Sequence, residues 1–426
     1  MRQFSFTGQA LLGLIALLSA LVLPQTLSNG DGLAWPAQAS GLDALTRDLE
    51  PVVVRGVFLG APVDQLFVYR ANGSVWEQIP FQVDEVTASG EYTTAEDGLI
   101  DANDEIVFMA KDLGNEASAP ISASLPISPT WYKFEVADPL APSQKGWAYI
   151  VRSTALSVTN PTDYVDYVAS NQRINATNYA LGWATDHPGL DYMTLFGSGD
   201  ILDRTKLRVK GRIGFIPFTL TEEDLPAADV VLIRDGPVRV ILQRGTAVTL
   251  AYASFLCTTT LMDLTQLPSN LVIDGARIST DLASTAIGGT FYNENVPLGV
   301  TIDGLPDSMS STTLTQAWRQ VSLDSGTMIQ VMDLGSPGGT LSHYYRDDST
   351  FDTNDTGDGR SYGDSGITVT NPTARSLQVV SAQYVLSGRQ PNRGGEFYAI
   401  FQNPLQVSWR LEGGEKAYLP IILGGR

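Results

Sequence analysis

Cysteine and histidine are scarce in this chain, which has one cysteine (Cys257) and two histidines (His187 and His343) in 426 residues. A single cysteine cannot form an intrachain disulfide, so stability has to come from a buried core or from a bound metal. With so few nitrogen and sulfur ligands, a zinc centre is not expected. His187 lies in the turn-like sequence Asp186-His187-Pro188-Gly189, and a structural role is favoured for it.

Basic residues are also few: 27 Lys and Arg stand against 46 Asp and Glu, which gives a net charge of -19. A strongly acidic surface repels nucleic acid and anionic lipid, and it attracts divalent cations. The composition therefore excludes a nucleic-acid partner and makes a hard cation the natural ligand to look for.

Long hydrophobic runs are confined to the N-terminus. Ala10–Leu23 is an apolar run preceded by the basic Arg2 and followed by Ala37-Gln38-Ala39, an A-x-A sequence. The run is shorter than the roughly 20 residues that span a bilayer, and its length suits a signal peptide. We expect residues 1–39 to be a signal peptide, with an uncleaved anchor as the alternative. No later run can span a membrane, so the mature chain is expected outside the cytoplasm, secreted or at the cell surface.

Strand signals dominate the rest of the chain. Short β-branched and aromatic runs alternate with turn sequences such as Asn72-Gly73, and only Thr219–Ala228 looks like a helix start. The polar segment Thr154–Asn175 is the best candidate for a domain boundary. We predict an all-β fold: a small N-terminal β-sandwich over residues 45–155, followed by a larger antiparallel β-sandwich over residues 165–426.

Two stretches of the first predicted domain, Ile79–Glu85 (IPFQVDE) and Asp97–Phe108 (DGLIDANDEIVF), carry a resemblance. They are similar to an opening module of bacterial secreted β-sandwich proteins, which are largely uncharacterised and in some cases accompany polysaccharide-degrading systems. Asp235–Arg239 (DGPVR) resembles a strand turn of the same class, and Tyr418–Leu423 (YLPIIL) resembles an ending of bacterial surface proteins. The resemblance implies secretion and β-architecture, and it carries no catalytic residues.

The first candidate cation site lies in the second of these stretches, where Asp97, Asp101 and Asp104 supply carboxylates. If Asp97 is placed at position 5 of an EF-type loop, Gly98 falls at the required glycine position and Asp104 at position 12. Ala95, at position 3, cannot ligate a cation. The alternative is an acidic hairpin turn that leads into the apolar strand that follows.

The second candidate cation site is the segment His343–Gly366, which contains six aspartates and four glycines. With Asp352 at position 1 of such a loop, Asn354, Thr356 and Gly357 match the pattern. Asp358 adds an oxygen, and Asp364 comes one residue after the last ligand position. Calcium takes six to eight oxygen ligands, which this segment could supply. A solvated turn-rich loop is the alternative.

The start of the same segment offers a third possibility, catalysis. His343 or Tyr345 could act as the base in polysaccharide lysis, and Arg346 with a bound calcium could neutralise a uronate carboxylate. On a strand, however, His343 and Tyr345 point to one face while Tyr344 and Arg346 point to the other. At most half of the group can therefore line one cleft.

Taken together, these patterns favour a secreted or surface-associated, non-catalytic β-sandwich protein, ordered by calcium and binding a polysaccharide or another cell-surface component. The alternative is a carbohydrate-active enzyme, a polysaccharide lyase or glycoside hydrolase, with its site in the second domain. Four tryptophans could form a sugar-stacking platform in either case, although large aromatic residues in sandwiches more often belong to the core; they are Trp131, Trp147, Trp183 and Trp318.

Overall fold

The computed structural model describes residues 43–413 apart from 264, 266–268, 308 and 310. The predicted signal peptide and the ending Tyr418–Leu423 lie outside the described residues. The described chain forms two compact units. The smaller unit contains residues up to Thr162 and those from Pro404 onward, and the larger unit contains Asp163–Asn403.

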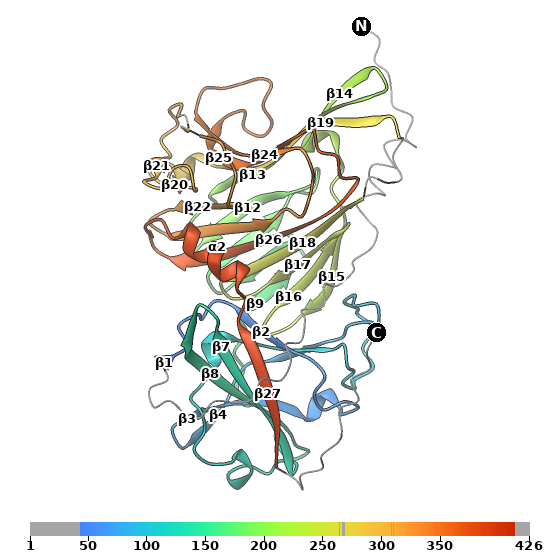
Figure 1. The fold of residues 1–426 in the computed structure, drawn as a ribbon, viewed down its shortest axis with the longest axis vertical. Coiled ribbons are helices and arrows are strands. Elements are labelled where there is room, and N and C mark those ends of the chain that lie inside the picture. The colour runs from blue at the N-terminus through green and yellow to red at the C-terminus, as the bar shows by residue number, and fades with distance from the viewer. Residues whose placement is uncertain (1–42, 264, 266–268, 308, 310, 414–426) are drawn as a thin grey trace. The chain divides into compact units, whose positions relative to one another are not determined.

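The smaller unit is built from two sheets (Figure 1). The larger of the two has the order β27-β7-β8-β3-β4, with β1 beside β8. Its strands are β1 (Asp43–Ala44), β3 (Leu66–Asn72), β4 (Val75–Gln78), β7 (Thr130–Asp138), β8 (Ala141–Arg152) and β27 (Gln406–Gly413). The second sheet, in the order β2-β6-β5, contains β2 (Pro51–Val54), β5 (Gln82–Asp84) and β6 (Glu105–Met109).

One apolar core joins these two sheets. It contains Val54 and Phe108 from the second sheet and Val68, Phe134 and Ile150 from the first. The opposite face of the first sheet is also covered, because Ile121 packs with aromatic residues of β3, β7 and β8. These buried aromatics include Trp131 and Trp147, which are core residues rather than a sugar platform.

The larger unit contains three sheets and one short helix, α2 (Gly394–Gln402). A four-stranded sheet contains β9 (Val165–Val168), β10 (Arg173–Ala176), β11 (Tyr179–Trp183) and β12 (Leu190–Leu195). A nine-stranded sheet contains β15 (Val230–Asp235), β16 (Val240–Arg244), β17 (Ala247–Ala251), β18 (Phe255–Asp263), β20 (Thr290–Tyr292), β21 (Val300–Thr301), β22 (Trp318–Ser322), β23 (Gly326–Asp333) and β26 (Ser376–Ser387).

The third sheet of the larger unit has the order β14-β13-β19-β25-β24 and is called the β13–β25 sheet below. Its strands are β13 (Leu202–Ile213), β14 (Ile216–Thr221), β19 (Leu271–Leu282), β24 (Thr340–Asp348) and β25 (Ser361–Thr370). All three sheets contribute to one apolar core, through residues such as Leu181, Leu242, Leu282, Phe291 and Tyr362. The expected helix start at Thr221 is a single 3-10 turn, Glu222–Asp224.

Four other 3-10 turns complete the described structure: Val63–Gln65, Ala110–Asp112, Ile121–Ala123 and Ser284–Ala286. The all-β fold predicted from the sequence is confirmed, and the sheets are antiparallel apart from the short β1, which pairs with β8 in parallel. Within the described residues, no helix has the length and apolarity needed to cross a membrane.

The domain limits differ from the prediction at the C-terminal end. The predicted second domain, 165–426, starts close to the observed start at Asp163, but it also includes β27. In the structure β27 pairs with β7 along its whole length, from Gln406 beside Ala137 to Gly413 beside Thr130. Figure 1 shows this strand lying among strands of the first unit. A strand pairs with whichever edge offers matching hydrogen bonds, and distance along the chain does not reveal that edge.

Candidate functional site

His343 and Tyr345 lie on the face of the β13–β25 sheet that packs into the core. The Nε2 atom of buried His343 is 3.0 Å from Oε1 of Glu294. Burial lowers the pKa of His343, although the Glu294 carboxylate acts in the opposite direction. The ring of Tyr345 stacks on Phe291 with ring centroids 4.4 Å apart, and burial raises its pKa. Both side chains are therefore part of the packed interior.

Tyr344 and Arg346 project from the other face of the same strand, as alternation requires. The guanidinium carbon of Arg277 lies 3.9 Å from the centroid of the Tyr344 ring. Arg346 contacts the carboxylates of Asp348 at 3.5 Å and Asp355 at 3.4 Å. The structure thus separates His343 and Tyr345 from Arg346, and the three predicted catalytic residues do not share a cleft.

The aspartate-rich loop after β24 makes many of its contacts with the protein itself. Oδ1 of Asp352 accepts a hydrogen bond from the Asn354 amide at 2.9 Å, and Oδ1 of Asp358 accepts one from the Arg360 amide at 2.8 Å. The hydroxyl of Thr356 accepts a hydrogen bond from Arg208 at 2.6 Å. These oxygens accept hydrogen bonds from backbone amides of their own turns or from Arg208 on β13.

The first candidate cation loop has a similar local organisation. Oδ1 of Asp97 accepts a hydrogen bond from the Leu99 amide at 2.8 Å. The buried Asp104 accepts hydrogen bonds from the amides of Val86 at 3.1 Å and Asp101 at 2.7 Å. Burial, reinforced by the charges of Asp104 and Asp97, raises the pKa of Glu85 beside them. The segment is an acidic turn held together by backbone amides.

Three other carboxylates lie close together, and one of them, Asp347, belongs to the end of β24. Single oxygens of Asp303, Asp307 and Asp347 all lie within 4.8 Å of one another, and none of the three was among the predicted ligands. Asp347 also accepts hydrogen bonds from the amides of Asp303 at 2.8 Å, Gly304 at 2.9 Å and Gly363 at 3.2 Å. Residues this far apart in the sequence show no ligand spacing, so no sequence motif could identify the group.

A dense set of charges lies on the outer face of the β13–β25 sheet, which we define by Lys206, Arg208, Asp281, Arg346 and Asp364. The Nζ atom of Lys206 is 2.5 Å from Oδ2 of Asp281 and 3.0 Å from Oδ2 of Asp355. Arg208 contacts Glu222 at 2.6 Å and Asp355 at 2.7 Å. Through these pairs the loop that carries Asp355 is tied to β13.

The pKa values within this network move in opposite directions. Burial, aided by the negative charge of Asp364, raises the pKa of Asp281 to about 8. Burial also acts to raise the pKa of Asp355, but the hydrogen bond and charge of Lys206, with hydrogen bonds from Thr356 and Arg208, outweigh it, and the pKa falls. Asp355 is thus held as the carboxylate, whereas Asp281 favours its neutral form.

A pattern in β13 could have indicated this network. Basic residues occupy every second position from Arg204 to Arg212, in a chain where acidic residues greatly outnumber basic ones. A strand whose basic residues all share one face is predicted to meet acidic partners there. The partners themselves, Glu222, Asp281 and Asp355, could not be chosen from so many acidic residues.

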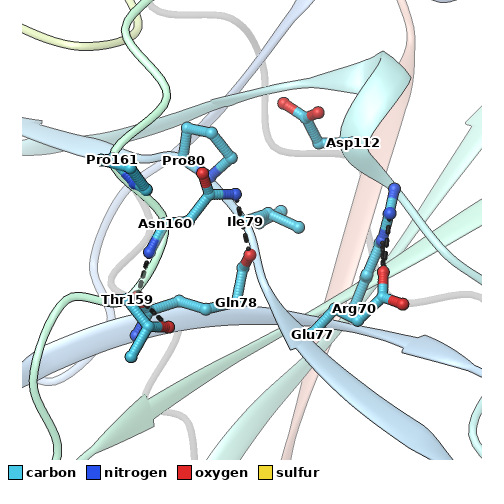
Figure 2. Close-up of a pocket in the computed structure, with 9 residues that line it drawn as sticks. All are labelled: Arg70, Glu77, Gln78, Ile79, Pro80, Asp112, Thr159, Asn160 and Pro161. Carbon is cyan, nitrogen blue, oxygen red and sulfur yellow. Dashed lines mark hydrogen bonds and ion pairs between the residues drawn. The ribbon is translucent and has the colours of Figure 1, made fainter.

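An open polar pocket lies in the smaller unit (Figure 2). It has a volume of about 310 Å³ and is lined by Arg70, Glu77, Gln78, Ile79, Pro80, Asp112, Thr159, Asn160 and Pro161. Arg70 donates to Glu77 at 2.7 Å. The Gln78 side chain accepts a hydrogen bond from the Thr159 amide at 2.5 Å, and Asn160 donates to the Gln78 carbonyl at 3.1 Å. The chain after β8 is thereby fixed against β4.

Comparisons with known proteins give little further information. No family model matches the chain, and no curated protein matches it. Among solved structures, the chain is similar to the Slr1438 protein from Synechocystis sp. PCC 6803, with 9% identity and a TM-score of 0.27. This similarity covers 55% of the present chain and 100% of the other. A TM-score this low supports no conclusion about the fold or the function of the present chain.

Proposed function

We propose that this is a secreted or surface-associated protein that binds a neutral polysaccharide or a similar cell-surface glycan and has no catalytic role. The observation that carries the proposal is the polar pocket of the smaller unit, which is lined by a guanidinium, two carboxylates and two amide side chains. Such groups recognise sugar hydroxyls through hydrogen bonds. A chain with a net charge of -19 repels polyanionic glycans, so a neutral one is favoured.

The reactive side chains of the larger unit support a structural role for that unit. His343 is bonded to Glu294, Tyr345 is stacked on Phe291, and Lys206 is paired with two carboxylates. Groups held in this way stabilise the fold. A polysaccharide lyase or glycoside hydrolase would need some of them, or another acid–base pair, to face a sugar.

A single experiment addresses both binding and catalysis. The protein is incubated with neutral and uronic polysaccharides, and both retention in affinity electrophoresis and release of new chain ends are measured. We expect retention by a neutral glycan without new chain ends. Asn160→Ala should weaken the retention at least several-fold, because Asn160 lines the pocket. Asn175→Ala, at an exposed position of β10 in the other unit, is the matched control.

Two outcomes would contradict the proposal. Retention by no glycan, or retention that Asn160→Ala leaves unchanged, would remove the pocket as a binding site. Release of chain ends that persists through repurification would establish an enzyme, and the carbohydrate-active alternative would then replace the binding role.

Calcium ordering is a second part of the proposal, and Asp303, Asp307 and Asp347 are the residues that would hold the ion. Burial, followed by the charges of Asp303 and Asp347, raises the pKa of Asp307, and a divalent cation would relieve this repulsion. A ligand that binds only the folded state at one hundred times its Kd stabilises that state by about 2.7 kcal/mol.

Thermal unfolding in calcium and in chelator measures this effect. We expect a higher midpoint in calcium for the wild-type protein and for Asp97→Asn, and no difference for Asp307→Asn. Equal midpoints in the wild type would show that calcium does not order the protein.

A further inference from the structure

Three charged side chains are completely enclosed on adjacent strands of the β13–β25 sheet. Lys206 on β13, Asp281 on β19 and Asp364 on β25 each have 0% exposure. The Nζ atom of Lys206 lies 2.5 Å from Oδ2 of Asp281. Asp364 precedes Ser365, which is paired with Thr280, the neighbour of Asp281. The three side chains therefore form one group across three strands.

Asp364 is unusual within this group. Among the described residues, neither of its carboxylate oxygens has a hydrogen-bond partner. Its charge nevertheless acts on both Lys206 and Asp281. The charge of Lys206 is already balanced by the Asp355 carboxylate at 3.0 Å, so a further enclosed carboxylate costs several kcal/mol unless another group compensates it. A carboxylate beside an amine and a carboxyl group is placed to move a proton between them.

We propose that Lys206 and Asp281 are joined by an intramolecular isopeptide bond, and that Asp364 transfers the protons that its formation requires. The Lys206 ammonium gives a proton to the Asp364 carboxylate, and the resulting amine attacks Cγ of the protonated Asp281 carboxyl. A C–N bond forms, the C–OH bond breaks, and one water leaves. Asp364 relays a proton from nitrogen to the departing hydroxyl and ends the reaction protonated. No oxidant or cofactor is needed.

The surroundings select Asp281 rather than Asp355 as the electrophile. An amine attacks the carbonyl carbon of a neutral carboxyl group far more readily than that of a carboxylate. The raised pKa of Asp281 favours the neutral form. Asp355, in contrast, is held as the carboxylate by Lys206 at 3.0 Å and Arg208 at 2.7 Å. It therefore anchors the amine at 3.0 Å and does not react. The Tyr362 amide donates to Oδ1 of Asp281 at 2.9 Å, which fixes the orientation of that carboxyl.

The backbone around Asp364 is also arranged for close approach. A Cβ atom at Gly366 would collide with the backbone of Ile278 and Ser279. Glycine at this position allows β25 to lie tightly against β19, which brings Asp364 next to Asp281. The bond would link β13 covalently to β19 in a chain that cannot form an intrachain disulfide because Cys257 is its only cysteine.

The bond is tested on the fully denatured purified protein, so the result does not depend on whether a variant folds. Intact-mass measurement should give a wild-type mass lower than the sequence mass by one water. Asp-Gly sequences can lose the same mass by cyclising, so a protease digest must also be analysed. We expect a branched peptide in which the segments that contain Lys206 and Asp281 are joined.

Matched variants assign the roles. The branched peptide should be absent in Lys206→Met and strongly reduced in Asp364→Asn. It should persist in Lys210→Met, which alters an exposed lysine on the same strand, and in Asp104→Asn, which alters a buried aspartate of the smaller unit. Recovery of the Lys206 and Asp281 segments only as linear wild-type peptides would overturn the proposal. Unchanged branching in Asp364→Asn would overturn the role of Asp364. Neither result bears on glycan binding.

Discussion

The two faces of the β13–β25 sheet surround their charged residues differently. On the inner face, His343 and Tyr345 are packed among apolar side chains, and His343 has one acidic partner, Glu294. On the outer face, Lys206 and Arg208 form a continuous network with several carboxylates. The same strands therefore carry an isolated pair on one side and a network on the other.

The difference shows how burial determines the role of a side chain. An isolated pair inside an apolar layer depends on the protonation state of each partner, because no other charge can compensate a change. In a network, one charge interacts with several partners. If a central cation is removed, however, the buried carboxylates lose their partner and the folded state is strongly destabilised. The two faces should therefore respond differently to mutation and to pH.

The largest expected effect comes from breaking the outer network at Arg208. Arg208→Met removes the guanidinium between Glu222 and Asp355, which are 1% and 7% exposed. Loss of one partner of a buried pair destabilises a protein by about 3–5 kcal/mol. We expect a decrease of that size in the free energy of unfolding, measured by chemical denaturation.

Arg346→Met is the matched comparison on the same face. The Arg346 side chain is 31% exposed and its shortest contact with a carboxylate is 3.4 Å, so the expected loss is only about 0–1 kcal/mol. Equal losses in the two variants would show that burial does not distinguish these two arginines.

A smaller effect, confined to a pH range, is expected on the inner face. The pKa of His343 is lowered in the folded protein, so the unfolded state binds more protons at this residue below its usual pKa of about 6.5. The contribution of His343 to stability should therefore decrease as the pH falls from about 7 to 5, by at most about 1.4 kcal/mol per pH unit. The raised pKa of Asp281 acts with the opposite sign over this range, so the contribution of His343 is the difference between the wild type and His343→Gln. Denaturation midpoints measured across this range give the slope.

His343→Gln should remove this contribution from the profile, whereas His187→Gln should leave it, because His343 is still present. The lowered pKa of Glu294 also reduces stability in acid, but this contribution appears below the usual glutamate pKa of about 4.3 and outside the chosen range. A slope that is the same in both variants would contradict a role for His343.

Several features could be predicted from local sequence. Strand runs separated by turn sequences predict an all-β fold, and the polar segment Thr154–Asn175 lies at the observed boundary near Asp163. Alternation along β24 correctly separates His343 from Arg346. Each of these features depends on neighbouring residues and on the fixed period of a strand.

Other features depend on contacts between distant parts of the chain. Lys206 meets Asp281 and Asp355, and Asp347 meets Asp303, across long separations in sequence. Cation-loop spacing selected Asp352, Asn354 and Asp358, whose side chains the structure shows in local turns or on the surface. Spacing within a loop cannot show which oxygens are used by backbone amides, because those amides are placed by the fold.

The sequence alone therefore determined the fold class, the approximate division of the chain and the faces on which the residues of β24 lie. All three follow from local backbone geometry. The tertiary structure decided that β27 returns to the first unit, that His343 is buried against Glu294, and that Lys206, Asp281 and Asp364 meet on three strands. These outcomes were decided by strand pairing and packing between distant segments, because charge attraction alone cannot choose among 46 acidic residues.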